Sequence, residues 1–159
     1  MAKKTDEATT KFKVDISDLT KNITAAKKQM ALASAEFKNS TAGLDNWSKS
    51  ADGVSSKLTQ LGKNLQSQRS ILTDYRKQYE LTKNQYGENS KAAVDLKIKI
   101  ENQEAAIKTT EKSIDKYNNV LAELTQEQNK TVSATDHLSD TINAQEKSLT
   151  DIKKEYASV

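Results

Sequence analysis

The chain has 159 residues, of which 35% are hydrophobic, 30% charged and 5% aromatic, and its formal net charge is +3. The apolar fraction lies below the roughly 45–50% that is usual in globular domains, which argues against a thick central core. The near balance of charge and the absence of proline exclude a typical disordered chain, and the absence of cysteine excludes a disulfide framework or a thiolate metal site. What remains is the composition of long helices or a coiled coil.

The first residues, MAKKTDEATTKFKVD, are basic and contain no apolar run, so no secretory signal is predicted. No later segment is long and apolar enough to span a bilayer, and we expect a soluble protein made in a cytoplasm. We expect residues 1–12 to form a flexible head and residues 13–159 to form a coiled-coil rod segment.

Apolar residues recur every seven residues from Phe12 to Val159 without a change of phase. With Ile16 at position a and Leu19 at position d, 33 of the 43 a and d positions are apolar and none is charged. A strict heptad repeat predicts helices that supercoil left-handedly and pack these positions against each other. The predicted coiled-coil seam consists of Leu19, Ile23, Met30, Phe37, Leu44, Trp47, Leu58, Leu61, Leu65, Leu72, Tyr75, Tyr79, Leu96, Ile100, Ile107, Ile114, Tyr117, Leu121, Leu124, Leu138, Ile142, Leu149 and Ile152.

Three candidate breaks divide the repeat, at residues 42–45, 87–90 and 129–134. At residues 42–45, Gly43 can end one helix and Asp45 can cap the next. At residues 87–90, Gly87 can end a helix and Asn89 or Ser90 can cap the one that follows. The third rests on polar or small seam residues in QNKTVSATDH. The fold class is therefore all-α, with long heptad-repeat helices near 15–41, 45–86, 90–129 and 134–159.

Two arrangements of these helices fit the repeat: an extended rod of parallel chains, and helical hairpins. A hairpin turning at Gly87 places Gln68 opposite Ile107 and Gln103 opposite Leu72, so each buried amide loses hydrogen bonds worth roughly 1–3 kcal/mol. In a parallel rod Gln68 meets Gln68 and the amides can pair. This favours the parallel rod, although a single chain can also fold back on itself.

The row of g positions, beside the seam, becomes apolar over part of the chain. Ile71, Ala92, Ala106, Val120 and Ala134 all lie in this row. A stripe this wide suits a bundle of more than two helices.

No motif for catalysis, phosphate binding or metal binding is present. The single histidine, His137, lies at a c position, where we expect it to be solvated. Lys97 and Lys99, with Lys91 before them, form a mildly basic stripe. Asp95 and Glu101 are interleaved with these lysines, so we do not expect nucleic-acid binding. The sequence predicts no enzyme activity, no cofactor and no small-molecule ligand.

Three stretches together resemble the N-terminal region of tail tape measure proteins, from long-tailed phages and prophages of Gram-positive bacteria. These are VDISDL, SAEFKNSTAGLDNWSKSADG and YGENSK followed by further heptads, and the resemblance is specific over about residues 12–90. It implies an extended, oligomeric α-helical protein that fills the tail tube and sets its length during assembly. Members of the family are many hundreds of residues long, so we expect this chain to be an N-terminal piece.

The resemblance also implies the partners and the location. The expected partners are further copies of the chain, in a homo-oligomer expected to be a trimer, together with tail tube, tail tip and tail assembly chaperone proteins. The expected location is the tail lumen of the virion, after assembly in the host cytoplasm. The rival interpretation is a generic coiled-coil spacer or adaptor, which explains the heptads equally well but not the quoted stretches.

Overall fold

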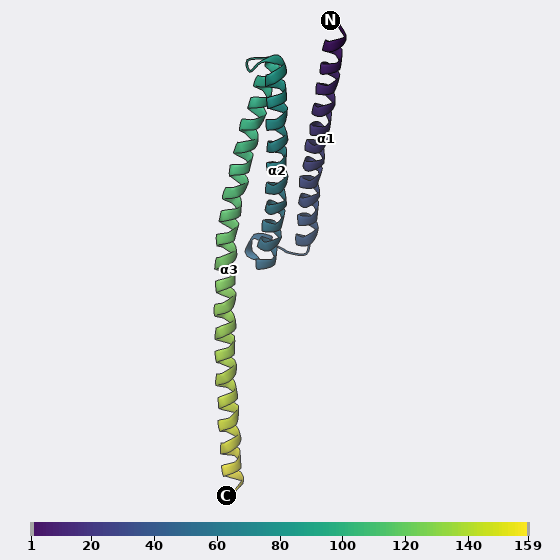
Figure 1. Cartoon of the computed structure of the whole chain (residues 1–159). Helices are drawn as coiled ribbons and strands as arrows, with labels where there is room; N and C mark the ends of the chain where they lie inside the picture. Colours follow the sequence, from purple (N-terminus) through teal and green to yellow (C-terminus); the bar gives the residue numbers. More distant parts are fainter. Residues whose placement is uncertain (1, 159) are drawn as a thin grey trace. The chain divides into compact units, whose positions relative to one another are not determined.

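The computed structural model describes the backbone of residues 2–158 and the side chains of residues 16–158, so the seam ends predicted at Phe12 and Val159 lie outside the described side chains. Its chain is 92% helical, and the described part contains no strand, which confirms the all-α prediction. Three helices, α1 (Ala2–Thr41), α2 (Ala51–Tyr86) and α3 (Lys91–Ala157), and one 3-10 turn, η1 (Trp47–Lys49), make up the chain (Figure 1). Residues 1–119 form one compact unit and residues 120–159 another.

The start of α1 differs from the predicted start near residue 15. The backbone is helical from Ala2, so the predicted flexible head of residues 1–12 is helical in its described part. This stretch contains neither glycine nor proline, and half of its residues are Ala, Lys or Glu, which have high helix propensity. Its side chains lie outside the described residues.

The turn between α1 and α2 contains the predicted break at Gly43. The amide N–H of Leu44 donates to the carbonyl of Thr41 at 3.1 Å, and the Thr41 hydroxyl donates to the carbonyl of Phe37 at 2.8 Å. The first bond satisfies a carbonyl group that the helix end leaves free, and the second ties the Thr41 side chain to the carbonyl four residues earlier. Gly43 does not use a positive φ, so it is not the left-handed cap that its position suggested.

The prediction that a helix begins at Asp45 is corrected. The Asn46 side chain accepts the amide N–H of Ser48 and caps η1, and Ser50 accepts the amide N–H of Gly53 at 3.3 Å and caps α2. Two cap residues four positions apart make a short turn before the long helix, because an Asn or Ser cap fixes an extended backbone at its own position.

The turn between α2 and α3 is centred on Gly87. Its φ of 89° and ψ of 156° are accessible to glycine and strained for other residues, and its amide N–H still donates to the carbonyl of Lys83. Ser90 accepts the amide N–H of Ala93 at 3.2 Å, so Ser90 rather than Asn89 caps α3.

The break predicted at residues 129–134 is absent, since α3 continues to Ala157. The Thr131 hydroxyl donates to the carbonyl of Glu127 at 3.0 Å, and the Thr135 hydroxyl donates to the carbonyl of Thr131 at 2.9 Å. Threonine can end a helix by capping it, but here both hydroxyls are used within the helix. Polar seam residues without Gly or Pro therefore do not stop it.

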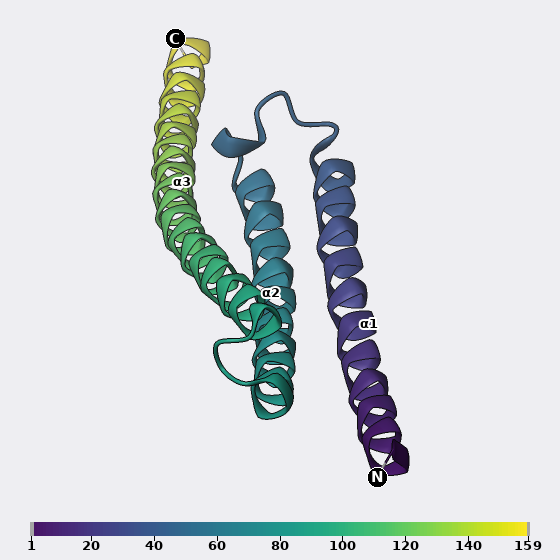
Figure 2. The ribbon, with the colours of Figure 1, turned by 90° about the horizontal axis from the view of Figure 1, so that it is seen from above.

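Within residues 1–119, α2 lies between α1 and the first part of α3, and neighbouring helices run antiparallel (Figures 1 and 2). The hairpin is thus the arrangement of this chain in residues 51–119, and it differs from the favoured parallel rod. Nine buried apolar residues form the core of this unit: Ile23, Ala33, Val54, Leu61, Ile71, Leu72, Ala93, Leu96 and Ile107.

Gly53 supplies a test of the turn before α2. A Cβ atom at Gly53 would lie 2.3 Å from the backbone oxygen of Trp47, and backbone cannot easily move away. We expect Gly53→Ala to lower the free energy of unfolding by about 1–3 kcal/mol, as overpacking does. Urea unfolding followed by Trp47 fluorescence measures this.

Gly62→Ala is the matched control in the same helix. No atom lies within 4 Å of a Cβ placed there, so this change should stabilise α2 by about 1 kcal/mol through helix propensity. If both variants shifted the midpoint in the same direction, the close approach of Trp47 to Gly53 would be refuted.

Candidate assembly interface

The predicted seam residues between 19 and 124 fall into three groups by exposure. Ile23, Leu61, Leu72, Leu96 and Ile107 are buried, and Leu44, in the turn, is exposed. The others are partly buried: Leu19, Met30, Phe37, Trp47, Leu58, Leu65, Tyr75, Tyr79, Ile100, Ile114, Tyr117, Leu121 and Leu124. The seam is thus largely covered where a neighbouring helix is present.

Several buried residues lie outside the seam, because α2 has a neighbour on each side. Ile71, at a g position, is only 2% exposed, as the apolar g row suggested. Gln60, Asp74 and Gln78 are also buried, although a single-seam repeat places them on its flank or away from it. The wide g row was the one signal in the sequence for this second face.

Hydrogen bonds between α1 and α2 satisfy two of these polar side chains. The Gln60 amide donates to the Ser34 hydroxyl at 3.0 Å, and the Gln78 amide donates to the Thr20 hydroxyl at 3.2 Å. Satisfied polar groups in a core fix the register of the helices, because a shift would leave each donor without an acceptor.

One of the two seam glutamines at the α2–α3 contact keeps a hydrogen bond, although the hairpin was expected to remove the bonds of both. The Gln103 amide donates to the backbone carbonyl of Gln68 at 3.0 Å, so Gln103 keeps a hydrogen bond although it faces no other amide side chain. The side-chain oxygens of Gln68 and Asn64 are buried without a partner. Each such acceptor costs about 1–3 kcal/mol, so the hairpin does carry part of the predicted penalty.

An aromatic cluster joins α1, η1 and α3 within the first unit. The ring of Trp47 lies 5.1 Å from that of Phe37 in an edge-to-face arrangement and 5.7 Å from that of Tyr117. The Lys57 ammonium lies 4.9 Å from the centre of the Phe37 ring. Such contacts add about 0.5–1.5 kcal/mol to area burial, so Trp47 acts as a core residue.

Ion pairs across both helix contacts match the antiparallel register. Arg69 pairs with Glu111 at 2.9 Å and Arg76 with Glu104 at 2.7 Å between α2 and α3, and Lys63 pairs with Glu36 between α2 and α1. All three pairs are largely exposed, so each contributes at most about 1 kcal/mol. The three pairs form only at this offset between the helices, so they favour it over other registers.

A groove of about 650 Å³ lies between α1 and α2. Small side chains line it on both helices, among them Ala25 and Ala26 on α1 and Ser67 and Ser70 on α2. Leu32, also in the lining, is 52% exposed. Four of the twelve lining residues are apolar (Ala25, Ala26, Leu32 and Ala33) and the others are polar or charged, and the small side chains leave room for a close approach of another helix.

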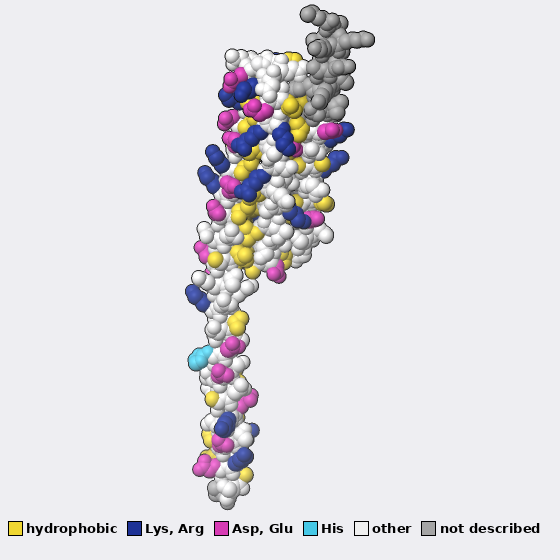
Figure 3. Space-filling model, in the orientation of Figure 1, with side chains coloured by type: hydrophobic (Ala, Val, Ile, Leu, Met, Phe, Trp, Pro, Cys, Tyr) yellow, Lys and Arg dark blue, Asp and Glu magenta, His cyan; other side chains and the backbone are white. Residues whose placement is uncertain are grey.

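The predicted seam is uncovered in the second unit, where every residue from 125 to 158 is exposed. Figure 3 shows hydrophobic side chains, in yellow, at intervals along this part of α3. The exposed seam, named here the α3 stripe, consists of Leu138 (60% exposed), Ile142 (47%), Leu149 (53%) and Ile152 (47%). Four large aliphatic residues on one face of a helix need a partner to be removed from water.

A metal site or a membrane span would give the described residues a further role. No group of three or more His, Asp or Glu side chains among them could hold a metal ion, and His137 is exposed. None of the described helices is both long and apolar enough to cross a membrane. The groove and the α3 stripe are therefore the candidate functional surfaces.

Comparison with family models, with curated proteins and with solved structures gives no match to the chain.

Two isoleucines of α3 test which face is covered. Ile107 is 9% exposed and Ile98 is 54% exposed, so Ile107→Asp places a charge in the α2–α3 contact whereas Ile98→Asp places one in water. We expect Ile107→Asp to cost about 3 kcal/mol or more of unfolding free energy, and Ile98→Asp to change it by less than about 0.5 kcal/mol. Thermal melting followed by circular dichroism compares the two, and equal melting curves would contradict the packing of α3.

Proposed function

We propose that this chain is a structural, self-associating segment of a phage tail tape measure protein, which fills the tail tube and helps to set its length. The observation that carries the proposal is in the second unit: an uninterrupted helix whose heptad apolar residues are all exposed from Leu138 to Tyr156. A length measure needs a constant rise per residue, and an α-helix supplies about 1.5 Å for each residue. The resemblance of residues 12–90 to the family supports the same function.

Self-association follows from the α3 stripe in this proposal. A helix that exposes Leu138, Ile142, Leu149 and Ile152 gains free energy when another helix covers them, by about 25 cal/mol for each Å² of apolar surface. Further copies of the chain are the expected partners. The expected contacts with tail tube, tail tip and chaperone proteins remain predictions, as does the trimeric state.

The hairpin changes which residues count toward length. α2 and the first part of α3 lie side by side and antiparallel (Figure 1), so the length of this hairpin is that of one helix and not the sum of two. Residues 120–157 are the last part of α3, and 36 residues of it, from Leu121 to Tyr156, correspond to about 54 Å. The proposal therefore places length measurement in the second unit.

In-frame deletion within the second unit tests the proposal in assembled tails. Removal of Gln128–Ser148 takes out three whole heptads, 21 residues, and rejoins the seam in phase. We expect tails shorter by about 32 Å, from the helical rise, and electron micrographs measure this.

Removal of Gln128–Thr150 is the matched control. It deletes 23 residues but rotates the seam at the junction by about 200°, since each of the two extra residues turns the helix by about 100°. This variant should assemble poorly. Tails of wild-type length from the 21-residue deletion would refute the length-setting function and favour a generic spacer.

A further inference from the structure

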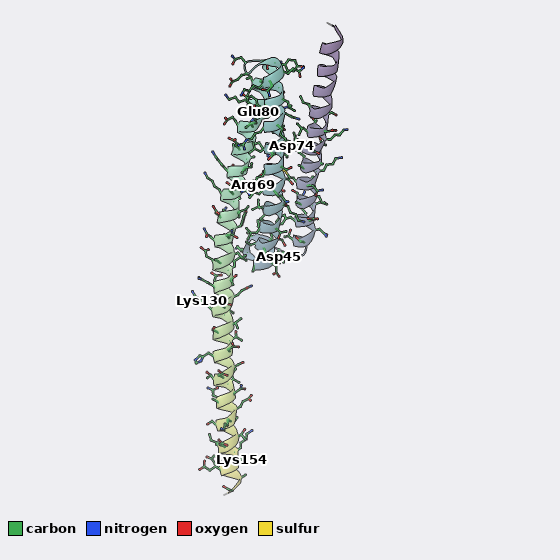
Figure 4. All side chains as sticks on the ribbon, in the orientation of Figure 1. Asp45, Arg69, Asp74, Glu80, Lys130 and Lys154 are labelled. Atoms are coloured by element: carbon green, nitrogen blue, oxygen red, sulfur yellow. The ribbon has the colours of Figure 1, made fainter. Side chains whose placement is uncertain are left out.

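Asp74 is a buried acidic residue without a partner. It is 7% exposed, and among the residues whose side chains are described it forms no hydrogen bond or ion pair. Asp74, labelled in Figure 4, lies on α2 in the lining of the groove between α1 and α2. Its carboxylate oxygens are not among the fully buried side-chain atoms without a partner, so they stay reachable from the groove, where an added ammonium group could form a charge-assisted hydrogen bond with them.

The groove has the shape that a docked helix requires. Ala25, Ala26, Ser67 and Ser70 leave space between α1 and α2, and Leu32 offers exposed apolar surface. Along α1 the lining runs from Asn22 to Glu36, which corresponds to about 21 Å of helix. At the far end the Lys63–Glu36 ion pair satisfies both charges, so Asp74 alone remains unmatched.

The α3 stripe has the same length as the groove. From Leu138 to Ile152 it also corresponds to about 21 Å of helix, and the described structure leaves it uncovered. Lys153 follows Ile152 at an e position, directly beside the stripe, and it is exposed. A helix docked through the stripe would thus carry an ammonium group at one edge of its apolar face.

Net charge is opposite on the two units. Residues 120–159 contain 4 Lys and Arg against 7 Asp and Glu, which leaves 21 and 15 of the chain's 25 and 22 for residues 1–119. The first unit therefore carries +6 and the second −3. Association between copies is favoured when the second unit of one meets the first unit of another.

Packing of one stripe on another in parallel register lacks comparable support. It would bring polar residues together at the seam positions Gln128, Thr131, Thr135 and Gln145. Its flanking g and e positions offer no ion pair, because they pair as Glu127–Val132, Ala134–Ser139, Thr141–Glu146 and Ser148–Lys153. It would also leave Asp74 unmatched.

We propose that the groove between α1 and α2 of one copy binds the α3 stripe of a second copy, with Lys153 of the second copy paired to Asp74. The pairing of Gln78 with Thr20 places Asp74 level with residues 22–25 of α1, so the docked helix runs antiparallel to α1 and parallel to α2. The contact joins two different surfaces, so copies add head to tail and each end of a chain of copies keeps one free surface. This proposal does not depend on the length-setting function.

Mixing two blocked variants tests this arrangement. Ala25→Trp fills the groove and Leu149→Asp charges the stripe, and both residues are exposed, so circular dichroism should show unchanged helix content. Sedimentation should find each variant monomeric alone, while the wild type associates. An equimolar mixture should form a 1:1 dimer, because each variant keeps the surface that the other has lost.

Two outcomes would overturn the proposal. One is a wild type that stays monomeric up to about 1 mM, the weak limit of specific binding. The other is an Ala25→Trp variant that associates as the wild type does, which would indicate stripe-to-stripe packing. Tail length plays no part in either measurement, so failure here is distinct from failure of the length-setting function.

A double-mutant cycle tests the ion pair itself. Asp74→Asn and Lys153→Gln should each raise the dissociation constant by about tenfold, and the double variant should be no weaker than either single variant. Lys154→Gln is the matched control, since Lys154 lies at an f position away from the stripe, and it should change the constant by less than about threefold. Additive losses, or equal losses for Lys153 and Lys154, would refute the pair.

Discussion

The arrangement of residues 1–119 depends on one constraint: α2 must bury two faces at once, one against α1 and one against α3. A heptad repeat supplies one apolar seam, which is enough for one neighbour. The second face is therefore built partly from glutamine, threonine and aspartate. Hydrogen bonds from Gln60 to Ser34 and from Gln78 to Thr20 make this burial tolerable. The result is a thin, partly polar core whose register is fixed by hydrogen bonds as much as by apolar contact.

The same repeat has a different outcome in the second unit. The heptad phase does not change between the two units, yet most seam residues are at least partly covered up to Leu124 and all are exposed from residue 125 to residue 158. The difference is whether a neighbouring helix is present. α2 begins at Ala51 and packs beside the first part of α3, and the described structure gives the last part of α3 no neighbouring helix. A heptad helix that is longer than the helix packed beside it keeps an exposed apolar seam, which is suited to association with other chains.

The sequence predicted the helical class, the turn at Gly87 and a cap at Asn89 or Ser90, because these residue types have local backbone preferences that act regardless of the rest of the chain. It misplaced the start of α2, because Asp45, Asn46 and Ser50 are all competent caps and tertiary contact with Trp47 selects among them. It also predicted a break in α3 from polar seam residues, which alone do not stop a helix. The buried positions of Gln60 and Asp74 could not be predicted from one seam, because they depend on which second helix lies beside α2.

The hydroxyl groups of the threonines have a consequence for how these helices meet water and one another. In all three helices threonine hydroxyls donate to the carbonyl four residues earlier, as Thr24, Thr73 and Thr141 do. Such a side chain carries its hydrogen bond with it and presents its methyl group outward. It can pass from solvent to a protein contact, or slide along a surface, without first finding a new acceptor. Apolar residues of a partner can pack against such a helix and separate from it again while these hydroxyls keep their hydrogen bonds to the helix backbone.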